Sequence, residues 1–133
     1  MIITKKFVFH AAHRLWNTSW TSEKNNEIYG RCCNLHGHSY RLTIFLEGRV
    51  DETGMVLNFN TLDAIVEDKI LSRYDHSYLN ELPEFETKVP TSENILKVIA
   101  SSLESEISKY DEIILKELRL KETATSEAII KLN

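Results

Sequence analysis

Apolar and polar residues alternate in two segments of the N-terminal half. In Ile2–His13 the side chains of Phe7, Phe9 and Ala11 share one parity with His13. From His38 onward the alternation returns, with one face formed by Tyr40, Leu42, Ile44 and Leu46. A period of two residues is typical of a strand that buries one face, so the sequence predicts two strands here.

A turn and a third strand are predicted next. Asp51-Glu-Thr-Gly54 has the composition of a tight turn, in which Gly54 can adopt a positive φ. The mostly apolar segment Met55–Phe59 follows this turn. We interpret the two segments as a β-hairpin whose return strand is Met55–Phe59.

Two helices are predicted after this hairpin. Asn60 is a suitable N-cap for a helix with the apolar stripe Leu62, Ile65, Val66 and Ile70. Pro90-Thr-Ser92 opens a second helix, whose apolar positions at helical spacing are Ile95, Ile99, Leu103 and Ile107.

The remaining segments complete the predicted order. Strand-like periods return at Ile114–Leu120 and Ala128–Leu132, whereas Trp16–Arg31 is polar and predicted to be a long loop. The order is β-β-β-α-α-β-β, an α+β fold in which two helices cover one face of an antiparallel sheet. No repeat or linker interrupts it, so we expect residues 1–133 to form a single domain.

Composition narrows the class of protein. Hydrophobic residues make up 42% and charged residues 27% of the chain, which is typical of a soluble globular protein. The net charge of -4 and the lack of a basic block argue against nucleic-acid binding. Without a signal peptide or an apolar stretch of ~20 residues, we expect a cytoplasmic protein that does not bind membranes. The adjacent cysteines Cys32 and Cys33 make a disulfide framework unexpected.

His36-Gly37-His38 is the strongest candidate for a metal site. Residues two apart in a strand lie on one face, about 6.6–6.8 Å apart, so two imidazoles can converge on one ion. Gly37 leaves room for a metal or ligand against the backbone. His13, at the end of the first predicted strand, completes the site if the two strands pair. Three neutral imidazoles with an open fourth position are typical of catalytic zinc.

Two other interpretations of this pattern stay open. A His-x-His pair is often only a surface or core pair. A structural Cys₂His₂ zinc site is another option, although adjacent cysteines rarely converge on one tetrahedral ion. Its ligands would be Cys32, Cys33, His36 and His38.

Other residues are candidates for acid–base chemistry or binding. Cys32 would gain thiolate character near a metal and could act as a general base, or it could be a buried, inert thiol. Asp75-His76 can line one pocket, where the carboxylate raises the basicity of the imidazole, although most such pairs are solvated surface residues. Glu122 lies where a predicted strand runs into a loop, a common place for a binding carboxylate. His10 has no partner motif and is expected to be structural.

Ordered motifs extend over nearly the whole chain. They are Phe9-His-Ala-Ala-His-Arg-Leu15, Tyr29-Gly-Arg-Cys32, Leu35-His-Gly-His-Ser-Tyr40, Val50-Asp-Glu-Thr-Gly-Met-Val56, Tyr74-Asp-His-Ser-Tyr-Leu-Asn80, Pro90-Thr-Ser-Glu-Asn94 and Lys121-Glu-Thr123. Together they resemble the 6-pyruvoyltetrahydropterin synthase family, including its bacterial 6-carboxytetrahydropterin synthase branch. Each motif alone is weakly specific, but the ordered set is highly specific.

This resemblance implies a fold, an assembly and a substrate. The fold would be the tunnelling fold, in which protomers join edge to edge into a trimeric barrel, usually stacked as a hexamer, with active sites between subunits. Barrel closure would remove the exposed edges of a small open sheet. The substrate would be 7,8-dihydroneopterin triphosphate, and Zn²⁺ would be held by His13, His36 and His38.

The resemblance also implies residue roles. Cys32 would abstract a proton from the substrate side chain, and Asp75-His76 would relay the others. Glu122 would accept hydrogen bonds from the pterin ring, with assistance from Glu93. Triphosphate would leave by elimination. No redox cofactor is needed, because oxidation and reduction both occur within the substrate.

Two features point to different products. The polar segment Trp16–Arg31 resembles the long form found in tetrahydrobiopterin-pathway enzymes, whereas the three residues between Cys32 and His36 match the 6-carboxy branch. We favour 6-carboxy-5,6,7,8-tetrahydropterin, made for the queuosine (deazapurine) pathway with release of acetaldehyde, over 6-pyruvoyltetrahydropterin. Side-chain cleavage of a dihydroneopterin and a non-catalytic zinc-binding module are further alternatives.

Overall fold

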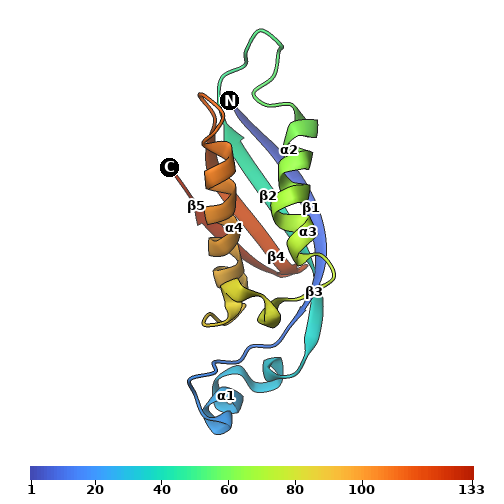
Figure 1. Cartoon of the computed structure of the whole chain (residues 1–133), viewed down its shortest axis with the longest axis vertical. Coiled ribbons are helices and arrows are strands. Elements are labelled where there is room, and N and C mark those ends of the chain that lie inside the picture. The colour runs from blue at the N-terminus through green and yellow to red at the C-terminus, as the bar shows by residue number, and fades with distance from the viewer.

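The chain folds into a five-stranded sheet with helices on one face (Figure 1). The computed structural model describes residues 1–133. The sheet order is β3-β1-β2-β4-β5, and every neighbouring pair is antiparallel except β1 and β3, which are parallel. The strands are β1 (Ile2–His13), β2 (His36–Glu47), β3 (Ser77–Tyr78), β4 (Ile114–Thr123) and β5 (Ser126–Lys131).

Two helical segments cover the same face of the sheet (Figure 1). The first is α2 (Phe59–Val66), which continues through a π-helical turn at Glu67–Leu71 into α3 (Ser72–Tyr74). The second is α4 (Ser92–Ile107), capped by Thr91, whose side chain accepts from the Asn94 N–H. All eight predicted apolar positions of the two helices are buried, so the predicted α+β class and the two-helix layer are confirmed. None of the helices has the length and apolar composition that crossing a membrane requires.

The core lies between the sheet and these helices. Odd-numbered residues of β1 and even-numbered residues of β2 face the helices, and Phe9, Tyr40, Leu42 and Ile44 are fully buried there. The opposite face of the sheet carries no helix. The predicted strand periods are therefore correct for both long N-terminal strands.

The predicted return strand at Met55–Phe59 is wrong. The side chain of Asn58 accepts from the Asn60 N–H at 2.8 Å, which starts α2 at Phe59. Met55 and Phe59 remain exposed, and the segment pairs with no strand of the sheet. The third strand of the sheet is instead the two-residue β3, which makes the sheet mixed rather than purely antiparallel.

The prediction that Trp16–Arg31 is a long, irregular loop is also wrong. This segment contains α1 (Ser22–Tyr29) and a 3₁₀ turn at Gly30–Cys33, which form a lobe projecting beyond the end of the sheet (Figure 1). Asn25, fully buried within this polar lobe, holds it together. Its side chain donates to the Asn17 and Thr21 carbonyls and accepts from the Asn17 N–H.

Candidate functional site

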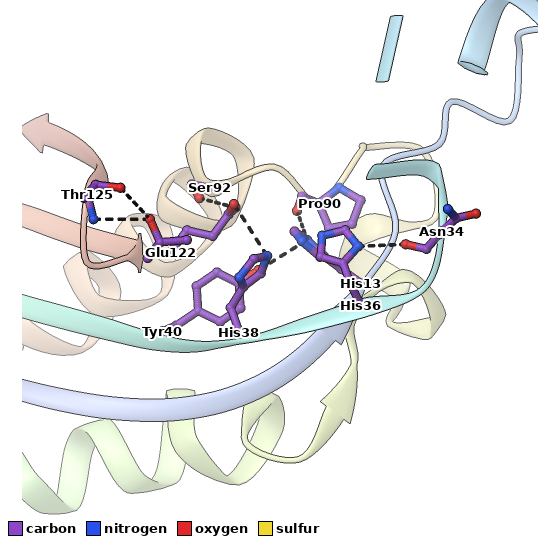
Figure 2. Close-up of polar contacts among 10 residues, drawn as sticks. His13, Asn34, His36, His38, Tyr40, Pro90, Ser92, Glu122 and Thr125 are labelled. Atoms are coloured by element: carbon purple, nitrogen blue, oxygen red, sulfur yellow. Dashed lines mark hydrogen bonds and ion pairs between the residues drawn. The ribbon is translucent and has the colours of Figure 1, made fainter. Parts of the chain in front are cut away.

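The pairing of β1 with β2 brings three imidazoles together. His13 lies opposite His36, and Ala11 lies opposite His38, so all three histidines point to the helix-covered face. The ring centroids are 4.6 to 5.1 Å apart, and one ligand atom from each ring lies within 4.8 Å of the others. Figure 2 shows the three rings grouped at the end of the two strands. These three residues could hold a metal ion.

Backbone carbonyls orient two of the rings. The Nδ1 of His13 lies 2.8 Å from the Pro90 carbonyl, just before α4, and the Nδ1 of His36 lies 2.7 Å from the Asn34 carbonyl (Figure 2). A carbonyl only accepts, so each Nδ1 carries the proton and each Nε2 is left with a free lone pair. Metal-binding histidines are commonly oriented in this way.

Two ring nitrogens of the cluster form no hydrogen bond within the protein. The Nε2 atoms of His13 and His38 are buried and form no hydrogen bond. Buried polar atoms are nearly always paired, so this geometry fits a bound ion. Burial also lowers the pKa of both imidazoles, which favours the neutral form that binds metals.

Neither cysteine belongs to this cluster. The buried Cys33 thiol donates to the Asn25 carbonyl at 3.2 Å. The Cys32 thiol is half-buried and is not among the grouped ligand atoms. The Cys₂His₂ interpretation is therefore wrong, and three nitrogen ligands leave a position open. The Cys32 carbonyl accepts from the Leu15 N–H at 2.8 Å, which ties its turn to the chain just after His13.

The interpretation of Gly37 needs correction. Gly37 has the opposite parity to its two histidine neighbours, so its missing side chain lies on the helix-free face. A Cβ atom there would approach the Ala11 carbonyl to 3.2 Å. Gly37 therefore accommodates the backbone of β1 and does not make room for a metal.

One predicted carboxylate lies beside the imidazole cluster, and a second shares its cavity. Glu122, near the end of β4, places Oε1 3.5 Å from the His38 Nε2, and Ser92 donates to its other oxygen at 2.8 Å (Figure 2). The 3.5 Å contact is too poor for a hydrogen bond and is an ion pair only if His38 is protonated. Glu93 and Glu122 line one cavity of about 250 Å³ together with Leu15 and Thr91.

The Asp75–His76 pair lies apart from this cluster. It stands next to β3, at the edge of β1, and joins His10 on the helix-free face. The His10 N–H donates to Asp75 at 2.8 Å, and the His10 carbonyl accepts from the His76 N–H. The first of these bonds is the main reason why the pKa of Asp75 lies below its ordinary value. His76 Nδ1 lies 3.0 Å from the Asp75 carboxylate.

His10 was expected to be structural, but it is an exposed neighbour of this pair. Its ring lies 5.9 Å from the His76 ring, and its Nδ1 lies 2.9 Å from the Ser39 hydroxyl. The side chains of His10, Ser39 and His76 line a hollow of about 460 Å³, which also reaches His38. The even parity of His10 in β1 was the available signal, because it predicted the face opposite His13.

Comparisons with known proteins agree on one family. The family model described as "6-pyruvoyl tetrahydropterin synthase" matches residues 2–133. A 6-pyruvoyl tetrahydrobiopterin synthase of Dictyostelium discoideum is 33% identical over 98% of this chain and 96% of its own length. A 6-carboxy-5,6,7,8-tetrahydropterin synthase of Synechocystis is 38% identical over 77% of this chain and 74% of its own length. The solved 6-pyruvoyl tetrahydropterin synthase of Caenorhabditis elegans superposes with a TM-score of 0.87 at 32% identity, covering 100% of this chain and 97% of that one.

Proposed function

The chain belongs to the 6-pyruvoyl tetrahydropterin synthase family of pterin lyases, and from this premise we propose that it acts on 7,8-dihydroneopterin triphosphate with one bound Zn²⁺. The observation that carries the proposal is the cluster of His13, His36 and His38, whose unpaired nitrogens lie beside the cavity of Glu93 and Glu122. Bound at these imidazoles, zinc would supply a Lewis acid that stabilises negative charge developing on substrate oxygens.

Glu122 is proposed to bind the pterin ring. A carboxylate accepts hydrogen bonds from ring N–H groups in a charge-assisted pairing. Ser92 holds one of its oxygens at 2.8 Å, which limits rotation of the carboxylate. Glu93 lines the same cavity and assists at its rim. The ring would thus lie beside the three imidazoles, with its side chain directed to their open position.

Proton transfer is assigned to Cys32 and to Asp75–His76. Cys32 would take a proton from the substrate side chain, because its turn is tied to the segment that follows His13. The Asp75–His76 pair lies on the other face of β1 and β2. We therefore propose that a second copy of the chain supplies this pair, in a trimeric barrel that could stack further into a hexamer and in which the free edges at β3 and β5 pair.

The product is proposed to be 6-carboxy-5,6,7,8-tetrahydropterin, on the spacing of three residues between Cys32 and His36. A second candidate, 6-pyruvoyltetrahydropterin, is favoured by the α1 lobe and by the full-length similarity to the Dictyostelium enzyme. Incubation of the zinc-loaded protein with dihydroneopterin triphosphate separates the two. Release of acetaldehyde supports the first product, and triphosphate release without acetaldehyde supports the second.

The assignment of Cys32 has a matched test in the neighbouring cysteine. Cys32→Ala is expected to lower kcat by about 10²–10⁴-fold with zinc retained, as for loss of a general base. Cys33→Ala is expected to keep turnover, because its thiol is turned to the Asn25 carbonyl. Full turnover in Cys32→Ala would remove the thiol from the mechanism.

A further inference from the structure

A second cavity of about 250 Å³, lined in part by the residue that follows His13, takes no part in the proposed chemistry. Its walls come from the chain just after β1 and from the segment that leads into α4. They include Arg14, Trp16, Tyr78, Asn80, Glu86 and Lys88. Two of these residues carry positive charge.

The Arg14 guanidinium has no polar partner within the protein. Its Nε is buried without a hydrogen bond, and no ion pair to Arg14 is formed. The guanidinium instead stacks on Trp16, with its carbon 4.1 Å from the ring centroid. Stacking uses the flat face of the group and leaves its in-plane N–H donors for an anion. A buried, unpaired donor of this kind is costly unless a ligand pairs with it.

The backbone at this cation is fixed from both sides. The Asn80 side chain accepts from the Arg14 N–H and donates to the Arg14 carbonyl, both at 2.9 Å. Across the cavity, Asn94 donates to the Val89 carbonyl at 2.8 Å, next to Lys88. Glu86 also lines the cavity but forms no ion pair with either cation.

The position of the cavity connects it to the candidate metal site. Arg14 directly follows His13, and Lys88 lies two residues before Pro90, whose carbonyl is 2.8 Å from the His13 Nδ1. An extended chain advances only about 3.3 Å per residue, so the backbone of both walls lies within a few residues of His13 or of its hydrogen-bond partner Pro90.

We propose that Arg14 and Lys88 form a phosphate-binding subsite that holds the triphosphate of the substrate. This inference rests on the proposed function for the identity of the ligand, but the anion site itself does not require turnover. Arg14 would pair with phosphoryl oxygens through its fork of N–H donors, and Lys88 would add a point charge.

Three other cations, Arg119, Lys24 and Arg31, lack this combination of features. Arg119 is paired with Glu117 at 2.6 Å and lies on Phe45. Lys24 is exposed and lies over Trp20 on the α1 lobe. Arg31 is exposed and lines none of the cavities described above.

The test is calorimetric titration of the zinc-loaded protein with inorganic triphosphate, with zinc content checked afterwards. Arg14→Gln is expected to weaken binding about tenfold or more, Lys88→Gln less, and Arg14→Lys to an intermediate degree. The control is Arg49→Gln, an exposed arginine that pairs with Glu112 at 3.9 Å in a different part of the chain and should change binding by less than about twofold. Far-UV circular dichroism verifies folding of each variant.

A second measurement separates the phosphate tail from the ring. The inhibition constant of 7,8-dihydroneopterin, which lacks phosphates, should be the same for Arg14→Gln and the unchanged protein. Equal triphosphate affinity in the two proteins, or no binding to the unchanged protein, would overturn the subsite. Arg14-dependent binding in a protein that does not turn over dihydroneopterin triphosphate would keep the subsite and overturn the proposed function.

Discussion

The two faces of the β1–β2 pair carry different halves of the proposed chemistry. On the helix-covered face, three imidazoles from two antiparallel strands meet within 4.8 Å, and backbone carbonyls orient two of them. On the helix-free face, Asp75 and His76 attach to the backbone of His10, and the His76 side chain is mostly exposed. The metal-binding half is complete within one chain, whereas the proton-relay half faces outward.

The difference shows that odd and even positions of a strand place their side chains in different sites. Adjacent residues of a strand project to opposite faces, so His10 and His13, three apart, cannot serve the same side of the sheet. His76 also adopts a left-handed backbone with φ of 61°, which is unfavourable for a side chain with a Cβ. Its two hydrogen-bonded links to His10, one direct and one through Asp75, hold this conformation.

The largest expected effect comes from the covered face. His13→Ala should remove one ligand and the best-buried ring of the cluster, with loss of zinc and a fall in turnover of about 10³-fold, or about 4 kcal/mol. Metal analysis and steady-state kinetics measure both. His10→Ala, on the other face, is the control and should retain zinc. Zinc bound at full stoichiometry by His13→Ala would contradict the division between faces.

A smaller loss, without loss of metal, is expected on the helix-free face. Asp75→Asn should lower kcat by about 10²-fold, the lower end of what general acid–base catalysis contributes, because the His76 imidazole loses its carboxylate partner, while zinc content stays unchanged. Asp111→Asn, in the turn before β4, is the matched control. Loss of zinc in Asp75→Asn would mean that the two halves are not separate.

Mixing the two variants sharpens the comparison. If a second copy completes each site, His13→Ala and Asp75→Asn chains refolded together should regain part of the activity, because some sites combine an intact cluster with an intact pair. Each variant refolded alone is the control. Activity of the mixture no higher than the sum of the two would place both halves in the same chain.

The smallest expected effect concerns the brace behind the Asp75–His76 pair. Glu84 binds Arg73 at 2.5 Å and Tyr74 at 2.8 Å, just before Asp75, and the Arg73 guanidinium lowers the pKa of Glu84 to about 2. The ordinary pKa of a glutamate carboxyl is 4.5, so the lowered pKa of Glu84 stabilises the fold at pH values above 4.5. This contribution is lost as the pH falls toward 2. Glu84→Gln should therefore lower the free energy of unfolding by about 1 kcal/mol at pH 7 and by less at pH 3. Urea denaturation at both pH values measures this, and an equal loss at both would contradict it.

The cluster of three imidazoles was predictable because it depends on strand periodicity. His36 and His38 share a face by parity alone, and His13 joins them once β1 and β2 pair. The helix stripes were predictable for the same reason, since each buries a continuous apolar face. The Asp75–His76 pair was identified as a motif, but the side of the sheet on which it lies could not be predicted. That side depends on β3, which is too short to show an alternation of apolar and polar residues.

Other features depend on polar contacts that have no periodic signal. The α1 lobe is held by the side-chain amide of Asn25, so its helix lacks an apolar stripe. The strand predicted at Met55–Phe59 is wrong because the side chain of Asn58 caps a helix that starts at Phe59. Arg14 could not be distinguished from the other arginines and lysines by sequence, because its stacking on Trp16 is visible only in the fold.

The central claim is that three imidazoles bind one zinc ion with a fourth position open to substrate. X-ray absorption at the zinc edge, with metal analysis of the purified protein, tests it most directly. The expected result is one zinc per chain with nitrogen ligands at about 2.0–2.1 Å and no sulfur. A sulfur shell at about 2.3 Å, or a protein that binds no zinc, would contradict it.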